Sequence, residues 1–164
     1  MRVRFEGGDV AMARHMATYR TSIVRVIELA ETKSSPASTW DLDLNGAMGE
    51  VAFCKSHNVF PDFTFRRQKG GADCHYFGSR IAVKATFSRE PYLWSPPWGN
   101  ELPPIDYYVL VHLRGDYADL LGWATPDELF GKTGMHYGKE VFMLQPDELH
   151  LLPNEPLPRK TDDH

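Results

Sequence analysis

One stretch of the chain, residues 70–86, holds a carboxylate and an ammonium whose spacing lets them act on the same group. Two short apolar-rich runs flank Gly78-Ser79, and a Gly-X pair of this kind favours a type II′ turn between antiparallel strands. If this turn joins the two strands, Asp73 lies directly opposite Lys84. A carboxylate can hold a hard cation and a lysine ammonium can approach an anion, so the pair is a site hypothesis with a defined geometry.

The same hairpin is expected to have two unlike faces, because side chains alternate along a strand. His75 and Ala82 share the face of Asp73 and Lys84. The other face is largely apolar and is expected to pack into a core. It consists of Cys74, Tyr76, Ile81 and Val83.

The composition predicts a single folded domain. The chain has 164 residues, of which 42% are hydrophobic and 12% aromatic, which is enough for a sizeable core. We expect one domain over residues 1–152 and a flexible, charged tail over residues 153–164. No apolar run approaches the ~20 residues of a membrane span and no N-terminal signal pattern is visible, so we expect a cytoplasmic protein without a membrane partner.

Charge and cysteine content narrow the partners and the compartment. The net charge of −4 argues against a protein that holds nucleic acid by bulk electrostatics alone, although a local basic surface is compatible with it. Cys54 and Cys74 have no metal-binding spacing. We therefore expect two free, buried thiols in a reducing compartment.

A first helix is expected over residues 9–33. Apolar residues recur there at three- and four-residue steps, the pattern of an amphipathic helix, and Asp9 is the expected cap. His15 and Arg20 lie off the apolar stripe, and for both we favour a place on the solvated surface over contact with a ligand.

A second helix is expected over residues 46–57, with Asn45 as its cap and an extended segment over residues 40–44 before it. Glu50 lies in the middle of this helix beside an apolar stripe. On this segment alone, Glu50 is expected to be an exposed helix glutamate.

The rest of the chain is predicted to be mostly strands joined by short turns. A short helix over residues 125–130 has a threonine cap and a proline at its first position. Residues 1–8 and 131–138 are expected to be loops. Residues 59–65 are expected to be a turn followed by a strand, and further strands are expected over residues 92–95, 107–113, 117–123 and 141–144.

This ordered set of motifs resembles the PD-(D/E)XK nuclease superfamily, in particular its small phage- and mobile-element-type members. The resemblance covers residues 40–150 and implies the α/β (α+β) class, with a restriction-endonuclease-like core in which helices flank a central mixed sheet. The matching pieces are Gly49-Glu50 on a helix, Gly70-Gly71-Ala72-Asp73 on one strand, Val83-Lys84-Ala85-Thr86 on the next, and Leu121-Gly122-Trp123-Ala124 later.

The resemblance also implies a role for each matching residue. Asp73 would be the central metal-binding carboxylate, and Glu50 would be a second ligand or would hold a metal-bound water. Lys84 would position and activate the attacking water. The backbone carbonyl of Val83 would complete the shell of Mg²⁺ or Mn²⁺, hard cations that prefer oxygen ligands. A second alignment of the motif stays open, because Pro61-Asp62 is a literal Pro-Asp dipeptide. In that alignment Asp62 is the first acid of the motif in place of Asp73. We prefer Asp73, since the hairpin places it beside the lysine.

Position 82 departs from the pattern of the superfamily, which has Asp or Glu two residues before the lysine. This chain has Ala82. An engineered inactivating change, migration of the acid to Glu50 or Asp62, or a natural binding-only relative would each account for it. We favour the first, because the surrounding motif is intact. Loss of one carboxylate of three is expected to lower the rate of hydrolysis by ~10²–10⁴.

The resemblance predicts a metal-dependent DNA endonuclease, weakened or inactivated by Ala82, that would act in the host cytoplasm if a phage encodes it. A non-catalytic module that binds nucleic acid or protein on the same fold is the alternative. RNA is a less favoured substrate than DNA, and a homodimer would suit a double-strand cut. The aromatic segment with Trp94 and Trp98 is expected to pack rather than to stack on bases. Phosphate contacts are expected from Arg66, Arg67, Lys69, His75, Arg80 and Arg89.

Overall fold

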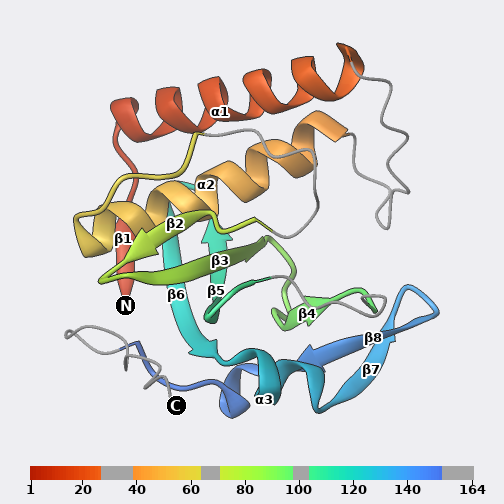
Figure 1. Ribbon diagram of the computed structural model, residues 1–164. Coiled ribbons are helices and arrows are strands. Elements are labelled where there is room, and N and C mark those ends of the chain that lie inside the picture. The colour runs from red at the N-terminus through yellow and green to blue at the C-terminus, as the bar shows by residue number, and fades with distance from the viewer. Residues whose placement is uncertain (27–38, 64–70, 98–103, 153–164) are drawn as a thin grey trace.

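The computed structural model describes residues 1–26, 39–63, 71–97 and 104–152. Its elements, in chain order, are β1 (Arg2–Arg4), α1 (Gly7–Val26), α2 (Thr39–His57), β2 (Cys74–Tyr76), β3 (Ser79–Thr86), β4 (Leu93–Ser95), β5 (Tyr107–Arg114), β6 (Tyr117–Ala124), α3 (Pro126–Phe130), β7 (Thr133–His136), β8 (Lys139–Leu144) and a 3-10 turn over Pro146–Glu148. Figure 1 shows α1 and α2 on one side of a sheet, with α3, β4, β7 and β8 on the other side.

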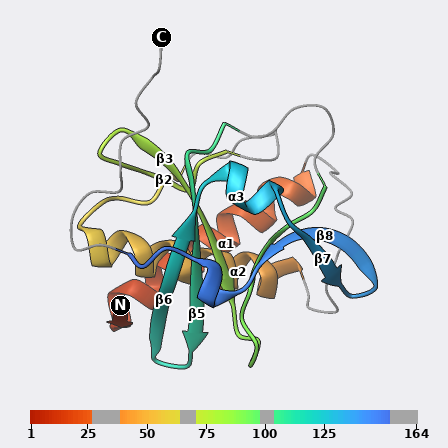
Figure 2. The ribbon, with the colours of Figure 1, turned by 90° about the horizontal axis from the view of Figure 1, so that it is seen from below.

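The described part of the chain forms two sheets. The larger sheet has the strand order β1-β6-β5-β3-β2, and the smaller one has the order β4-β8-β7. β3 and β5 run parallel, whereas the other neighbouring strands of the larger sheet run antiparallel. Figure 2, which is seen from below, shows β5 and β6 side by side in front of the two long helices. The fold is therefore a mixed α+β arrangement, as the sequence predicted at the level of class.

The two faces of the β2–β3 hairpin pack into two different cores. Ile81 and Val83 lie in a core with Phe53 of α2, which confirms that this face is the apolar one. On the opposite face, Ala82 belongs to a second apolar cluster that includes Tyr108 of β5 and residues of α3 and β8. The face that carries the predicted site is therefore partly covered by the smaller sheet and α3.

The pairing of the hairpin differs from the predicted one by two residues. Cys74 pairs with Ile81 and Tyr76 pairs with Ser79, so the turn residues are Phe77 and Gly78. Both have positive φ, 48° and 86°, which makes a type I′ turn in place of the expected type II′ turn. Because the side-chain period of a strand is two, a shift of two residues leaves every side chain on its predicted face.

Three further segments were predicted wrongly, two of them because a partner distant in the chain decides their structure. Residues 40–44 are the start of α2, and Asn45 lies inside that helix rather than at its cap. Residues 2–4 form β1 against β6, where a loose start was expected. Residues 133–136 form β7 against β8, where a loop was expected. The packing or pairing that stabilises the first two segments is not visible in a local pattern. The third is a local hairpin with the turn residues Tyr137 and Gly138, which the sequence prediction missed.

The first helix begins at Gly7 rather than after Asp9. Asp9 contributes from inside the first turn, where its carboxylate accepts the backbone N–H of Glu6 at 2.7 Å. The expected end of this helix at residues 27–33 lies outside the described residues. Of the segment expected as a turn and strand over residues 59–65, residues 59–63 are described and form no strand apart from an isolated bridge between Pro61 and Cys74, and the remaining two residues lie outside the described part.

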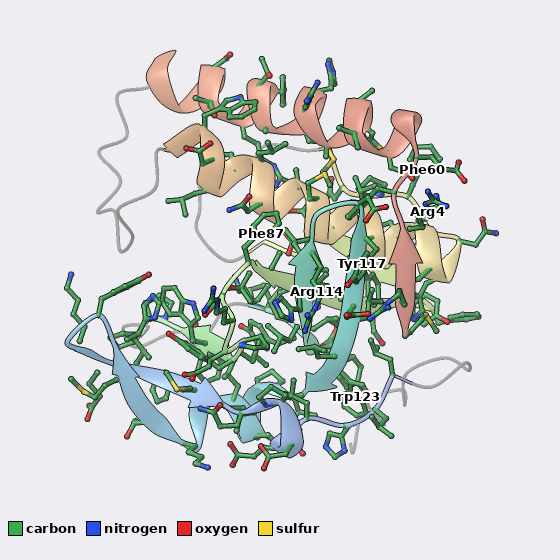
Figure 3. All side chains as sticks on the ribbon, turned by 180° about the vertical axis from the view of Figure 1, so that it is seen from behind. Arg4, Phe60, Phe87, Arg114, Tyr117 and Trp123 are labelled. Carbon is green, nitrogen blue, oxygen red and sulfur yellow. The ribbon has the colours of Figure 1, made fainter. Side chains whose placement is uncertain are left out.

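The central strands and the short helix confirm the sequence prediction. β5 and β6 form the expected antiparallel pair, and Thr125 caps α3 through a reciprocal pair of hydrogen bonds with Glu128. Trp123 holds the segment after the 3-10 turn against β6, since its Nε1–H donates to the Leu151 carbonyl at 3.2 Å (Figure 3). Both cysteines, Cys54 and Cys74, are buried and free, as expected.

No helix among the described residues is long and apolar enough to cross a membrane.

Gly49 allows α2 to lie directly on β3. A Cβ at Gly49 would come within 2.5 Å of the Ala85 Cβ and 3.5 Å of the Val83 Cγ1. A real side chain needs more room than this, so only glycine permits the contact. Because Glu50 is the next residue, this approach of helix to strand sets how deeply its carboxylate enters the structure.

Substitution of Gly49 by alanine tests this contact. Overpacking of a tight interface costs about 1–3 kcal/mol, so Gly49→Ala should lower the free energy of unfolding by that amount in urea denaturation. Gly46→Ala is the matched control, because a Cβ there meets nothing within 4 Å. Alanine in a helix interior is favoured over glycine by about 0.5–1 kcal/mol, so the control should be stabilising. Equal effects of the two substitutions would contradict the close contact.

Candidate functional site

Glu50 is buried and is paired with an arginine of the other long helix. Glu50 lies on α2 and is 3% exposed. Its carboxylate accepts two hydrogen bonds from Arg20 of α1, at 2.6 and 2.7 Å. This fork-to-fork geometry is the one that an arginine makes with an ionised carboxylate. The expectation of an exposed helix glutamate was therefore wrong, and so was the placement of Arg20 on the solvated surface.

Arg20 lies among three carboxyl groups rather than beside one. Burial alone would lower the pKa of its guanidinium. The hydrogen bonds to Glu50 and the negative charges of Glu50, Asp73 and Asp43 outweigh burial, and the pKa is raised. Asp43 is itself held by the Thr21 hydroxyl, which donates to its carboxylate at 2.6 Å. The guanidinium thus joins α1 to the acidic residues of α2 and of the segment before β2.

Asp73 lies directly before β2 and is tied to β3 and to the segment at Asp62. Its carboxylate accepts the backbone N–H of Val83 at 2.7 Å, and its own backbone N–H donates to the Ile81 carbonyl at 2.8 Å. Its carbonyl accepts the backbone N–H of Asp62 at 2.7 Å. The two alternative first acids of the motif, Asp73 and Asp62, are therefore neighbours in space.

The observed pairing changes the relation between Asp73 and Lys84. Continuation of the observed register leads from Asp73 towards Ala82, so the direct pairing of Asp73 with Lys84 was wrong. Lys84 lies farther along β3 on the same face and is exposed. Its positive charge still acts on the acid. Burial raises the pKa of the Asp73 carboxyl, while Lys84, the Val83 N–H and Arg20 oppose that rise.

Glu50 shares the same electrostatic environment as this pair. Burial, followed by the negative charge of Asp73, raises the pKa of the Glu50 carboxyl above its ordinary value, while Arg20 and Lys84 oppose the rise. α2 and the β2–β3 hairpin therefore bring the charges of Glu50, Asp73 and Lys84 to act on one another. These are the three residues that the motif resemblance selected.

The donor set does not fit a divalent cation as it stands. Both oxygens of Glu50 bind Arg20, and one oxygen of Asp73 binds a backbone N–H. Within the described ranges, no three Asp, Glu, His or Cys side chains are placed to hold a metal ion. Val83 contributes its N–H to Asp73, and the role predicted for its carbonyl stays a prediction.

Position 82 is a buried alanine beside a tyrosine whose hydroxyl lacks a partner. Ala82 is 4% exposed and pairs with Tyr108 in the parallel β3–β5 register. Tyr108 is 2% exposed, and its hydroxyl has no hydrogen-bond partner among the described residues. Burial raises the pKa of Tyr108 to about 12, and the charge of Asp73 acts in the same direction. Tyr108 was not singled out by the sequence, because a tyrosine in a buried strand reads as core.

Three of the six residues predicted to contact phosphate lie among the described residues. Arg80 is engaged with Asp106, to which its Nε and Nη2 donate at 3.0 and 2.9 Å. His75 and Arg89 are exposed. Trp94 packs against His136 with ring centroids 4.0 Å apart, in line with a packing role. Arg66, Arg67, Lys69 and Trp98 lie outside the described residues.

Comparisons of the chain with protein-family models, with curated proteins and with solved structures found no match.

Removal of the Tyr108 hydroxyl tests whether it lacks a partner in the folded protein. A buried hydroxyl without a hydrogen bond is costly, so Tyr108→Phe should leave the free energy of unfolding unchanged or raise it by about 1 kcal/mol. Tyr92→Phe is the matched control, because the Tyr92 hydroxyl binds His136 Nδ1 at 2.8 Å. The control should lose about 0.5–1.5 kcal/mol in urea denaturation. A larger loss for Tyr108→Phe than for the control would show that its hydroxyl is bonded.

Proposed function

We propose that this chain carries the phosphodiester site of a metal-dependent DNA endonuclease with a restriction-endonuclease-like core, and that alanine at position 82 weakens or abolishes cleavage. The observation that carries the proposal is the convergence of Glu50, Asp73 and Lys84 from α2, the start of β2 and β3. These are the residues that the motif resemblance selects, in the order in which it selects them.

The chemistry of these groups supports an anionic substrate. Lys84 is exposed and its positive charge acts on Asp73, so its ammonium can approach a phosphate oxygen from solvent. Asp73 is held in one orientation by the backbone of β3, which suits a group that has to position a reactant. Mg²⁺ or Mn²⁺ would polarise the phosphate when bound. Because the present donors do not fit such an ion, we assign no step to it in this chain.

Position 82 is where the missing donor would enter. Its side chain lies on the face of Lys84, close to the backbone that holds Asp73. The hydroxyl of Tyr108 next to it can donate to a new carboxylate there. An aspartate at this position would therefore add an oxygen donor in an environment able to satisfy it.

A second candidate function is a non-catalytic module that binds nucleic acid or protein. One observation favours it. Arg20 already satisfies both oxygens of Glu50, which is compatible with a site that holds an anion at Lys84 and performs no hydrolysis. Under this alternative, the natural residue at position 82 is alanine and restoration of an acid brings no activity.

Cleavage assays with Ala82→Asp separate the two functions. With Mg²⁺ or Mn²⁺, this variant should cut plasmid, single-stranded or branched DNA at least about 10²-fold faster than the unaltered chain, because one positioned acid supplies that much. EDTA should abolish the cutting. RNA tested in parallel should be cut more slowly.

Two variants serve as controls for that assay. Ala82→Asn places a group of the same size without charge and should gain no activity. Lys84→Ala combined with Ala82→Asp should lose the gained activity while it keeps its circular dichroism spectrum. If folded Ala82→Asp cuts no DNA with either metal, the endonuclease proposal fails, and retained DNA binding by the unaltered chain would then favour the binding module.

A further inference from the structure

Arg20 occupies a place that a cation would otherwise fill. Its guanidinium engages both Glu50 oxygens, at 2.6 and 2.7 Å, and Asp73 and Asp43 act on it electrostatically. These three acids come from α2 and from the segment before β2, and the guanidinium is the positive group that they share. Neither the composition nor the motif order singled out this residue.

The geometry makes Arg20 and a metal ion mutually exclusive on Glu50. A planar guanidinium uses both oxygens of a carboxylate at once, so neither retains its best direction for a second cation. Glu50 is almost fully buried, and water therefore cannot take over either oxygen without movement of Arg20. A divalent ion that binds Glu50 has to displace the guanidinium first.

Arg20 is able to leave without an opening of the core. The side chain of Arg20 is 28% exposed, whereas that of Glu50 is 4% exposed. The guanidinium can therefore move from the carboxylate into solvent by rotation of its own long side chain. The carboxylate, which is fixed by the contact of Gly49 with β3, has no comparable freedom.

We propose that Arg20 is a built-in counter-ion that competes with divalent cations for Glu50, so that metal binds this site only when the guanidinium is displaced or removed. The inference rests on the proposed function in one respect, which is that the site is one that takes Mg²⁺ or Mn²⁺. It assigns Arg20 a role in the control of metal occupancy and places no part of the reaction on it.

Metal titration of four purified proteins tests the competition. Ala82→Asp is the parent, and to it are added Arg20→Gln, Arg20→Lys or Arg2→Gln. Calorimetry with MnCl₂ gives the Kd, and the shift of the unfolding temperature with MnCl₂ gives an independent measure. Arg2→Gln is the matched control, because Arg2 makes a bidentate pair with Asp119, at 2.7 and 3.1 Å, on the outer strand β1.

Removal of the competitor should tighten metal binding. Arg20→Gln should lower the Kd for Mn²⁺ by about 5–150-fold, the usual range for coupling between two ligands of one protein. Arg20→Lys keeps the charge but cannot engage both oxygens, and it should lower the Kd by a smaller factor. Arg2→Gln should leave the Kd unchanged. If Arg20→Gln does not fold without metal, its recovery of a cooperative unfolding transition in MnCl₂ supports the proposal.

An unchanged or higher Kd in both Arg20 variants overturns the proposal, and so does an Arg20→Gln protein that MnCl₂ fails to restore. The cleavage assay is independent of this outcome. Ala82→Asp that cuts DNA, without tighter metal binding in the Arg20 variants, overturns the role of Arg20 alone. Tighter metal binding without cleavage or DNA binding by any variant overturns the endonuclease proposal alone.

Discussion

The ion pair between Arg20 and Glu50 is the interaction on which the charged region of this protein depends. A carboxylate as deeply buried as that of Glu50 needs a compensating charge, because an isolated buried ion is strongly destabilising. Arg20 supplies that charge from the neighbouring helix, and the negative charges at positions 43 and 73 also act on it. This one ion pair therefore both links α1 to α2 and balances the negative charge of the buried acids.

A second constraint is the depth at which α2 approaches the sheet. Glycine at position 49 lets the helix lie on Ala85 of β3, and Glu50 consequently enters near the segment that carries Asp73. On the other face of β3, the smaller sheet and α3 cover Ala82 and Tyr108. The candidate site thus lies where the two cores of the molecule meet, and Lys84 is its exposed member.

The hairpin part of the candidate site was predictable, because an error of two residues in strand register leaves each side chain on its predicted face. The predicted hairpin register was off by two residues, yet Asp73, Ala82 and Lys84 kept their common face, since strand side chains repeat every two residues. Glu50 was selected by motif order, although local pattern alone suggested an exposed position. Arg20 was missed because a single arginine off an apolar stripe has no local feature that distinguishes a buried ion pair from a solvated side chain.

The sequence by itself determined the mixed α+β class, the central strands, the capped short helix and the faces of the hairpin. Periodicity and capping are local properties, and a few neighbouring residues suffice to express them. Residues 133–136 were also missed as a strand, although they pair with β8 across the two-residue turn Tyr137-Gly138, which is a local feature of the chain. Only the tertiary structure decided that residues 40–44 belong to a helix, that residues 2–4 are a strand, and that Arg20 binds Glu50. Each of these three depends on a partner far away in the chain, and its free energy comes from contacts that no local window contains.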